Sequence, residues 1–434
     1  MSLADTQPRT ESRSWPRVVR RLSWGVIDQF VSSLSNFALG LYLARTLGAT
    51  VFGAFTLAFV TYTVILNASR GISTDPLLVR YSGATGLRWR EAVAASSGLA
   101  LLTGLGSGAL CVIAGLLMSG SLATAFIAIG VGLPGLMLQD SWRFAFFAAG
   151  RGLAAVANDV VWTVLLCLAI VLVHFWAGKT LLDCVLAFGG TATIAALVGV
   201  AQAKVLPRPG RASAWLREHR HLSVRYLIEN VSASGAGQVR SFVIGGVVGL
   251  AAVGYVRAAE IMMGPFLVIL MGVCQVAVPE ASRVFHQRPT RLIYFCLTLG
   301  GVQALVALLW GVALLIVFPI GLGNLLLANL WPPVHQLLPP VILNVAAVCL
   351  MTSATSGLRA MGVAKRSLRA QLITSVSYVG LGSLGAVFGG APGTCWGVMA
   401  ANSLGAVATW YQLRSALAAE PVLNPVPLQG VEPT

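Results

Sequence analysis

The sequence contains many apolar stretches of about 20 residues, the length that a helix needs to cross the hydrocarbon core of a membrane. Such stretches recur from Leu22 to Leu413 with short polar interruptions. Only 10% of the residues are charged, against roughly 25% in soluble domains. The sequence therefore excludes a water-soluble globular protein and predicts an all-α, polytopic transmembrane protein.

We expect about twelve transmembrane helices from these stretches. They are placed at 23–45, 48–70, 91–118, 121–145, 153–175, 181–203, 223–247, 250–278, 292–319, 336–360, 367–389 and 393–415. A long basic stretch divides them six and six. The predicted organisation is a cytoplasmic basic arm at 1–22, an N-lobe at 23–204, a cytoplasmic basic linker at 205–222, a C-lobe at 223–416 and a cytoplasmic tail at 417–434.

The formal net charge of +15 is distributed unevenly along the chain. Lys and Arg concentrate in the N-terminal arm and in every second loop, whereas the opposing loops contain only Arg45 and Lys179. Cytoplasmic loops of membrane proteins carry this excess of basic residues. The pattern predicts a multi-pass protein of the bacterial inner membrane with both termini in the cytoplasm, and we expect no nucleic-acid partner.

The two halves of the sequence resemble each other. At an offset of 201 residues, the glycines of the first helix-to-helix turn, Gly48 and Gly53, align with Gly249 and Gly254. Two weaker matches between the halves follow in the same order along the chain. They are a Pro-x-x-x-Arg pattern at 76–80 and 279–283 and the Arg-flanked turns at Gly150 and Gly362. Six helices per repeat give both lobes the same orientation, so a pseudo-two-fold axis along the membrane normal should relate them, with a cleft between.

Ionisable and polar side chains within the apolar stretches are candidate functional residues, because each is costly in hydrocarbon and usually faces an interior or a watery cavity. The first predicted helix has Asp28 and Asn36 on one face, and the seventh has Glu229, Gln238 and Arg240. We expect these two repeat-related helices to line the cleft. Arg240 is either a cavity residue or part of a structural ion pair.

Other charged residues have two interpretations each. Arg257 and Glu260 are spaced to form an ion pair or to contact a substrate, and Arg70 either faces the cavity or anchors the membrane interface. Near the turn after the fourth helix, Asp140 and Arg143, with Asp159 just beyond the turn, either organise a cytoplasmic gate or bind one another. Arg151 lies at the same turn.

Motifs for chemistry are missing from the sequence. It contains neither a G-x-x-x-x-G-K-[ST] phosphate loop nor a G-x-S-x-G nucleophile elbow. The seven cysteines show no C-x-x-C spacing, so neither a metal site nor a disulfide framework is indicated. We therefore expect no cofactor and no enzymatic activity. A membrane glycosyltransferase or ligase remains the enzyme alternative, although it would usually need a larger extramembrane loop with carboxylates.

Two stretches resemble a known family. The segment WGVIDQFVSSLSNF (24–37), followed by LARTLGATVFGAF (43–55), resembles the first two helices of bacterial polysaccharide-biosynthesis membrane proteins. These are O-antigen-type flippases of the multidrug/oligosaccharidyl-lipid/polysaccharide (MOP) exporter superfamily. The segment DSWRFAFFAAGR (140–151) is similar to their turn between helices four and five. The resemblance implies a two-lobed, MATE-like exporter that flips a polyprenyl-(pyro)phosphate-linked oligosaccharide by alternating access.

The resemblance also implies roles for the intramembrane residues. Substrate-binding candidates are Arg240, Arg257, Arg70, Asn36 and Gln238. Candidates for coupling to H⁺ or Na⁺ are Asp28, Glu229 and Glu260, and cytoplasmic gate candidates are Asp140, Arg143 and Arg151. The implied partners are membrane lipids, the lipid-linked glycan and other proteins of envelope-polysaccharide synthesis. A cation-coupled drug or metabolite antiporter and a non-transporting membrane scaffold are the alternatives.

Overall fold

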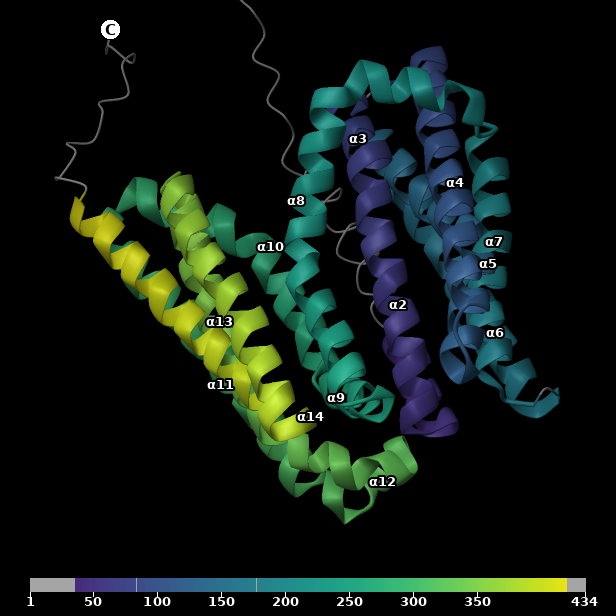
Figure 1. Cartoon of the computed structure of the whole chain (residues 1–434). Helices are drawn as coiled ribbons and strands as arrows, with labels where there is room; N and C mark the ends of the chain where they lie inside the picture. The colour runs from purple at the N-terminus through teal and green to yellow at the C-terminus, as the bar shows by residue number, and fades with distance from the viewer. Residues whose placement is uncertain (1–35, 83, 177, 420–434) are drawn as a thin grey trace, which may run out of the picture.

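The computed structural model describes residues 36–82, 84–176 and 178–419, and these residues are almost entirely helical, with no strand among them (Figure 1). Eight helical segments in this part of the chain are long and apolar enough to cross a membrane. The prediction of an all-α, multi-pass membrane protein is confirmed. The basic arm, Asp28 and the end of the tail lie outside the described residues.

The first half of the chain contains six helical rods within the described residues. A helix at 36–47 leads to α2 (Ala49–Ser69), which continues through a π-helical turn, η1 (Arg70–Thr74), into α3 (Asp75–Tyr81); α4 (Gly86–Leu116), α5 (Gly120–Ala148), α6 (Gly152–Trp176) and α7 (Leu181–Ala203) follow. The second rod therefore ends at Tyr81, whereas we expected it to end at residue 70. Pro76 does not end the rod, because the carbonyl of Ile72, to which proline cannot donate, accepts hydrogen bonds from Trp215 and Ser223.

The second half repeats this arrangement. After η2 (Pro209–Arg211) come α8 (Ala212–Val247), α9 (Leu250–Met262), α10 (Gly264–Gln287), η3 (Pro289–Arg291), α11 (Leu292–Ile316), η4 (Phe318–Ile320), α12 (Leu322–Leu327), η5 (Ala328–Leu330), α13 (Trp331–Ala360) and α14 (Ala364–Ala419). α14 is broken at Gly390 (φ 60°, ψ −141°) into two antiparallel parts. With α9 and α10 as one rod, this half also has six, so the two six-helix lobes are confirmed.

The basic stretch between the halves is largely helical, because α8 begins at Ala212 and not at 223. Its first turns pack on the first half of the chain. The indole nitrogen of Trp215 donates to the carbonyl of Ile72 (3.2 Å), and the hydroxyl of Ser223 donates to the same oxygen (3.1 Å). Because α8 buries Trp215 against the first half, the helix extends beyond the apolar stretch from which we predicted it.

The turn glycines confirm the internal repeat. α2 and α9 begin 201 residues apart, each directly after a glycine with positive φ, 75° for Gly48 and 109° for Gly249. The corresponding later turns use Gly150 and Gly362, with φ of 69° and 72°. Glycine adopts these angles without the strain that a Cβ would cause. The turn glycines that correspond in the two halves therefore share a left-handed backbone conformation.

Two aligned glycines also contact one another. A Cβ on Gly53 would overlap the carbonyl oxygen of Leu250, and a Cβ on Gly254 would overlap that of Ala49. Ala49 aligns with Leu250 just as Gly53 aligns with Gly254, so the contact is symmetric and the pseudo-two-fold axis passes through it. We call this contact the glycine crossing. From it, α10, α11, α13 and α14 lean away from α2 toward the end where α8 begins, here called the basic end, whereas α8 stays beside α2 (Figure 1).

Candidate functional site

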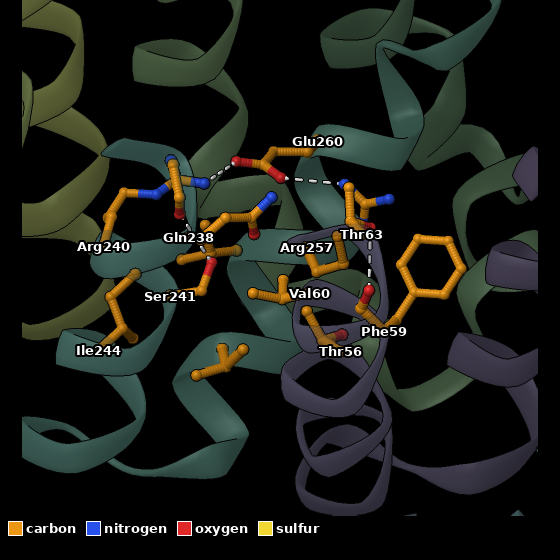
Figure 2. Close-up of a pocket in the computed structure, with 13 residues that line it drawn as sticks. Thr56, Phe59, Val60, Thr63, Gln238, Arg240, Ser241, Ile244, Arg257 and Glu260 are labelled. Carbon is orange, nitrogen blue, oxygen red and sulfur yellow. Dashed lines mark hydrogen bonds and ion pairs between the residues drawn. The ribbon is translucent and has the colours of Figure 1, made fainter. Parts of the chain in front are cut away.

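A cavity of ≈ 300 Å³ lies between the two lobes (Figure 2). One wall is α2 of the first half, and the other consists of α8 and α9 of the second half. The polar lining and its main aromatic neighbour are Thr56, Phe59, Thr63, Gln238, Arg240, Ser241, Arg257 and Glu260. The cavity therefore lies at the interface where the repeat predicts a cleft.

Three charged side chains meet in this cavity. Nη2 of Arg240 lies 2.6 Å from Oε1 of Glu260, and Nη1 of Arg257 lies 3.4 Å from Oε2 of the same carboxylate. Glu260 thus uses one oxygen for each arginine, and the three side chains together carry one surplus positive charge. Figure 2 shows Glu260 between the two guanidinium groups.

The two arginines differ in their surroundings. Arg240 is nearly buried, with its guanidinium carbon 5.4 Å from the ring centroid of Tyr378 on α14. Its Nε is buried and finds no hydrogen-bond partner among the described residues. The side chain of Arg257 is 41% exposed. Because a guanidinium group offers five N–H donors, both arginines keep donors that Glu260 does not use.

A second set of buried charges lies in the first half, away from the cavity. Asp140 binds Arg70 through two hydrogen bonds, from Nε to Oδ2 (2.9 Å) and from Nη2 to Oδ1 (2.6 Å). Arg143 pairs with Asp159 at 3.6 Å, and Gln139 donates to Asp159 at 2.8 Å. We call Arg70, Asp140, Arg143 and Asp159 the first-half network. Each of its acids has an arginine of its own.

The structure brings together four of the residues that the sequence singled out: Gln238, Arg240, Arg257 and Glu260 line one cavity. The predicted ion pair of Arg257 with Glu260 is confirmed. Arg70 is not part of the cavity lining and pairs with Asp140. The side chains of Asn36 and Glu229 are exposed outside the cavity.

Arg143 on α5 and Asp159 on α6 bind one another, which is one of the two alternatives predicted for the charged residues near this turn. Asp140 shares a helix with Arg143 at i and i+3, but the extended α2 rod places Arg70 beside α5, where Arg70 pairs with Asp140. Arg151 is exposed, with its guanidinium carbon 5.5 Å from the ring centroid of Phe146.

Sequence reasoning missed the α2 wall, because we expected the first helix to face the cleft. No residue of the described part of that helix, 36–47, lines the cavity. The signal was present in the repeat: at the offset of 201, Thr56 aligns with Arg257 and Phe59 with Glu260. Aligned positions of the two halves thus face the same cavity, and the first half presents the uncharged members.

No family model matches the sequence, and no curated protein matches it. Among solved structures, the chain is similar to the inward-facing conformation of a multidrug resistance MATE family transporter of the MOP superfamily (TM-score 0.69, 15% identity, covering 89% of this chain and 94% of that one). The two proteins share a fold.

Other MOP structures match as well. The lipid II flippase MurJ in an inward closed conformation gives a TM-score of 0.67 at 12% identity, over 89% of this chain and 87% of that one. An outward-facing MATE transporter of the superfamily gives 0.59 at 17% identity, over 93% and 96%. The neighbours thus include proteins named for drug resistance and for lipid flipping on one MOP fold, so the fold does not decide between these activities.

Proposed function

We propose that this protein is a membrane transporter that flips a polyprenyl-(pyro)phosphate-linked oligosaccharide or related glycolipid across the inner membrane by alternating access. The charge balance of the cavity carries this proposal, because two arginines share one carboxylate there. Guanidinium groups bind phosphate oxygens in pairs and remain charged when buried. A surplus positive charge with unused donors favours a phosphate-bearing substrate.

A cation-coupled drug antiporter is the main alternative on this fold. A site for organic cations is expected to offer surplus negative charge or several aromatic faces. Among the described residues that line the cavity, Glu260 is the single acid and both of its oxygens contact arginines, and Phe59 is the single aromatic residue. The lining therefore suits an anion better than a cation.

The orientation of the molecule supports a lipid substrate that enters from the cytoplasmic leaflet. The positive-inside rule assigns the basic end to the cytoplasm. The glycine crossing then closes the outer side of the cavity, while α10, α11, α13 and α14 lean away from the first half on the cytoplasmic side. The higher TM-scores of the inward-facing and inward closed neighbours agree with this state.

Depletion of the protein in its host tests the proposal. We expect one polyprenyl-linked glycan to accumulate in the cytoplasmic leaflet, detected by mass spectrometry together with a leaflet-specific labelling assay. Enzymes of envelope-polysaccharide synthesis would supply and consume this lipid. No accumulation, together with altered efflux of a small cation, would favour the antiporter.

Complementation of the depleted host tests the cavity arginine. Arg240→Ala should abolish complementation at unchanged membrane abundance, because the substrate phosphate loses its buried ligand. Arg240→Lys keeps the positive charge beside Glu260 but loses the planar guanidinium group that can bind phosphate through two hydrogen bonds, so it should restore complementation only in part. Arg283→Ala is the control, since Arg283 pairs with Glu280 at an exposed position outside the cavity. Full complementation by Arg240→Ala would remove Arg240 from the site.

A further inference from the structure

Glu260 occupies the place where an anionic ligand of the two arginines would bind. Its Oε1 contacts Arg240 at 2.6 Å and its Oε2 contacts Arg257 at 3.4 Å. Asp140, by contrast, accepts two parallel hydrogen bonds from Arg70 alone. The bridge through Glu260 therefore leaves donors of both arginines unused, and an incoming anion can take over each contact singly.

No second carboxylate lines the cavity with Glu260 among the described residues. α8 contributes Arg240 and α9 contributes Arg257. From α14, the phenol of Tyr378 packs on Arg240, and the thiol of Cys395 lies near both members of the Arg240 pair. The α2 wall is uncharged. Protonation of Glu260 alone thus changes the charge of the three-residue cluster from +1 to +2.

This change decides whether a pyrophosphate group is neutralised. A phosphate monoester carries about −1.5 to −2 charges at pH 7. In a pyrophosphate that is esterified at both ends, each phosphate keeps one ionised oxygen, so the whole group carries about −2 charges. If Glu260 stays ionised, binding leaves surplus negative charge in the cavity, and buried charge that lacks a partner is costly. If Glu260 is protonated, the two arginines balance the two charges of the pyrophosphate. The favoured complex therefore holds the anion and one additional proton.

We propose that Glu260 is an exchangeable counter-ion, whose carboxylate the phosphoryl oxygens of the substrate displace from Arg240 and Arg257 while it takes up one proton. This inference rests on the anionic substrate of the proposed function. The proton comes from a hydronium ion of the solvent at the open side of the cavity: its O–H bond breaks as an O–H bond forms on a carboxylate oxygen, a water molecule is left, and no other covalent bond changes. When the anion leaves, Glu260 loses the proton and binds the arginines again. Because linkage is reciprocal, proton binding strengthens anion binding and the reverse.

Calorimetric titration of the purified full-length protein in detergent tests this exchange. The probes are farnesyl diphosphate and inorganic pyrophosphate, titrated in buffers with different heats of ionisation to count the protons taken up. Wild type should take up about one proton more per diphosphate bound than Glu260→Gln does. The variant has no carboxylate at this position, so its proton count measures the titration of the ligand itself. At mildly alkaline pH, Glu260→Gln should bind farnesyl diphosphate about tenfold more tightly, which corresponds to about 1.4 kcal/mol.

Glu280→Gln is the matched control, because it removes a carboxylate that pairs with an arginine at an exposed position; it should behave as wild type does. Equal proton uptake by wild type and Glu260→Gln would overturn the exchange and leave the proposed function standing. So would weaker binding of farnesyl diphosphate by Glu260→Gln, if the thermal unfolding of this variant is unchanged. Binding of neither probe to wild type or variant would overturn both. Binding of farnesyl diphosphate but not pyrophosphate, with the additional proton, would support the exchange and assign the ligand as a lipid.

Discussion

The two lobes have the same fold but treat buried charge in different ways. In the first half, Arg70 and Asp140 saturate each other through two hydrogen bonds, and Arg143 has Asp159. In the second half, Glu260 is divided between two arginines, each with a single contact. The first-half network is balanced and structural, whereas the cavity cluster is unbalanced and open to a ligand. Buried arginines on one fold thus serve different purposes, which their partners reveal.

The first test of this comparison removes one acid from the first-half network. Asp140→Asn leaves Arg70 without its counter-ion, and breaking a buried ion pair in this way costs about 3–5 kcal/mol. We expect a large drop in the free energy of unfolding of the purified protein, measured by denaturant titration in detergent. The control Glu280→Gln breaks an exposed pair and should cost only about 0–1 kcal/mol. Equal losses for the two variants would show that the first-half network is not structural.

The second test addresses the region where the two lobes are alike. Gly53→Ala and Gly254→Ala each place a Cβ against a backbone carbonyl oxygen of the facing helix, and overpacking of this kind costs about 1–3 kcal/mol. We expect similar losses of stability, and a longer spin-label distance between the starts of α2 and α9 in both variants. Gly301→Ala is the control, because a Cβ there meets nothing within 4 Å. A large effect of only one of the two substitutions would contradict the symmetry of the crossing.

The third and smallest effect comes from removing both partners of a pair. Replacing Arg70 by Met together with Asp140 by Leu should bring stability back to within about 1–2 kcal/mol of wild type, since apolar residues of similar volume often replace a buried ion pair. The double variant Arg240→Met with Glu260→Leu should also stay folded but fail to complement the depleted host. Complementation by the second variant and not by the first would reverse the assignment of structural and functional roles.

Much of the fold could be predicted because its signals are local. Apolar stretches located the transmembrane helices, and the glycines of the first turn revealed the repeat, since a turn with positive φ needs glycine wherever it recurs. The C-terminal end of α3 and the start of α8 were missed because there the helix continues through polar residues. Tertiary contacts stabilise those turns, such as the hydrogen bonds of Trp215 and Ser223 to Ile72.

The candidate site was predicted in part for a related reason. Charges in apolar stretches identified Arg240, Arg257 and Glu260 directly. The pairing of Arg70 with Asp140 could not be derived, because it depends on two helices whose contacting residues lie 70 positions apart. The α2 wall of the cavity carries no charge, so a search for intramembrane charges passed over Thr56 and Phe59, although the repeat aligns them with Arg257 and Glu260.

The glycine crossing has the form of a homodimer interface enclosed within one polypeptide. In a two-fold dimer, residue i of one subunit contacts residue j of the other and the reverse, and every substitution appears on both sides. Here Gly53 meets the start of α9 and Gly254 meets the start of α2 in that reciprocal manner. A single covalent chain frees each copy to mutate alone. Such a chain can keep its axis intact while Thr56 and Phe59 diverge from Arg257 and Glu260, a division of labour that a dimer of identical subunits could not encode.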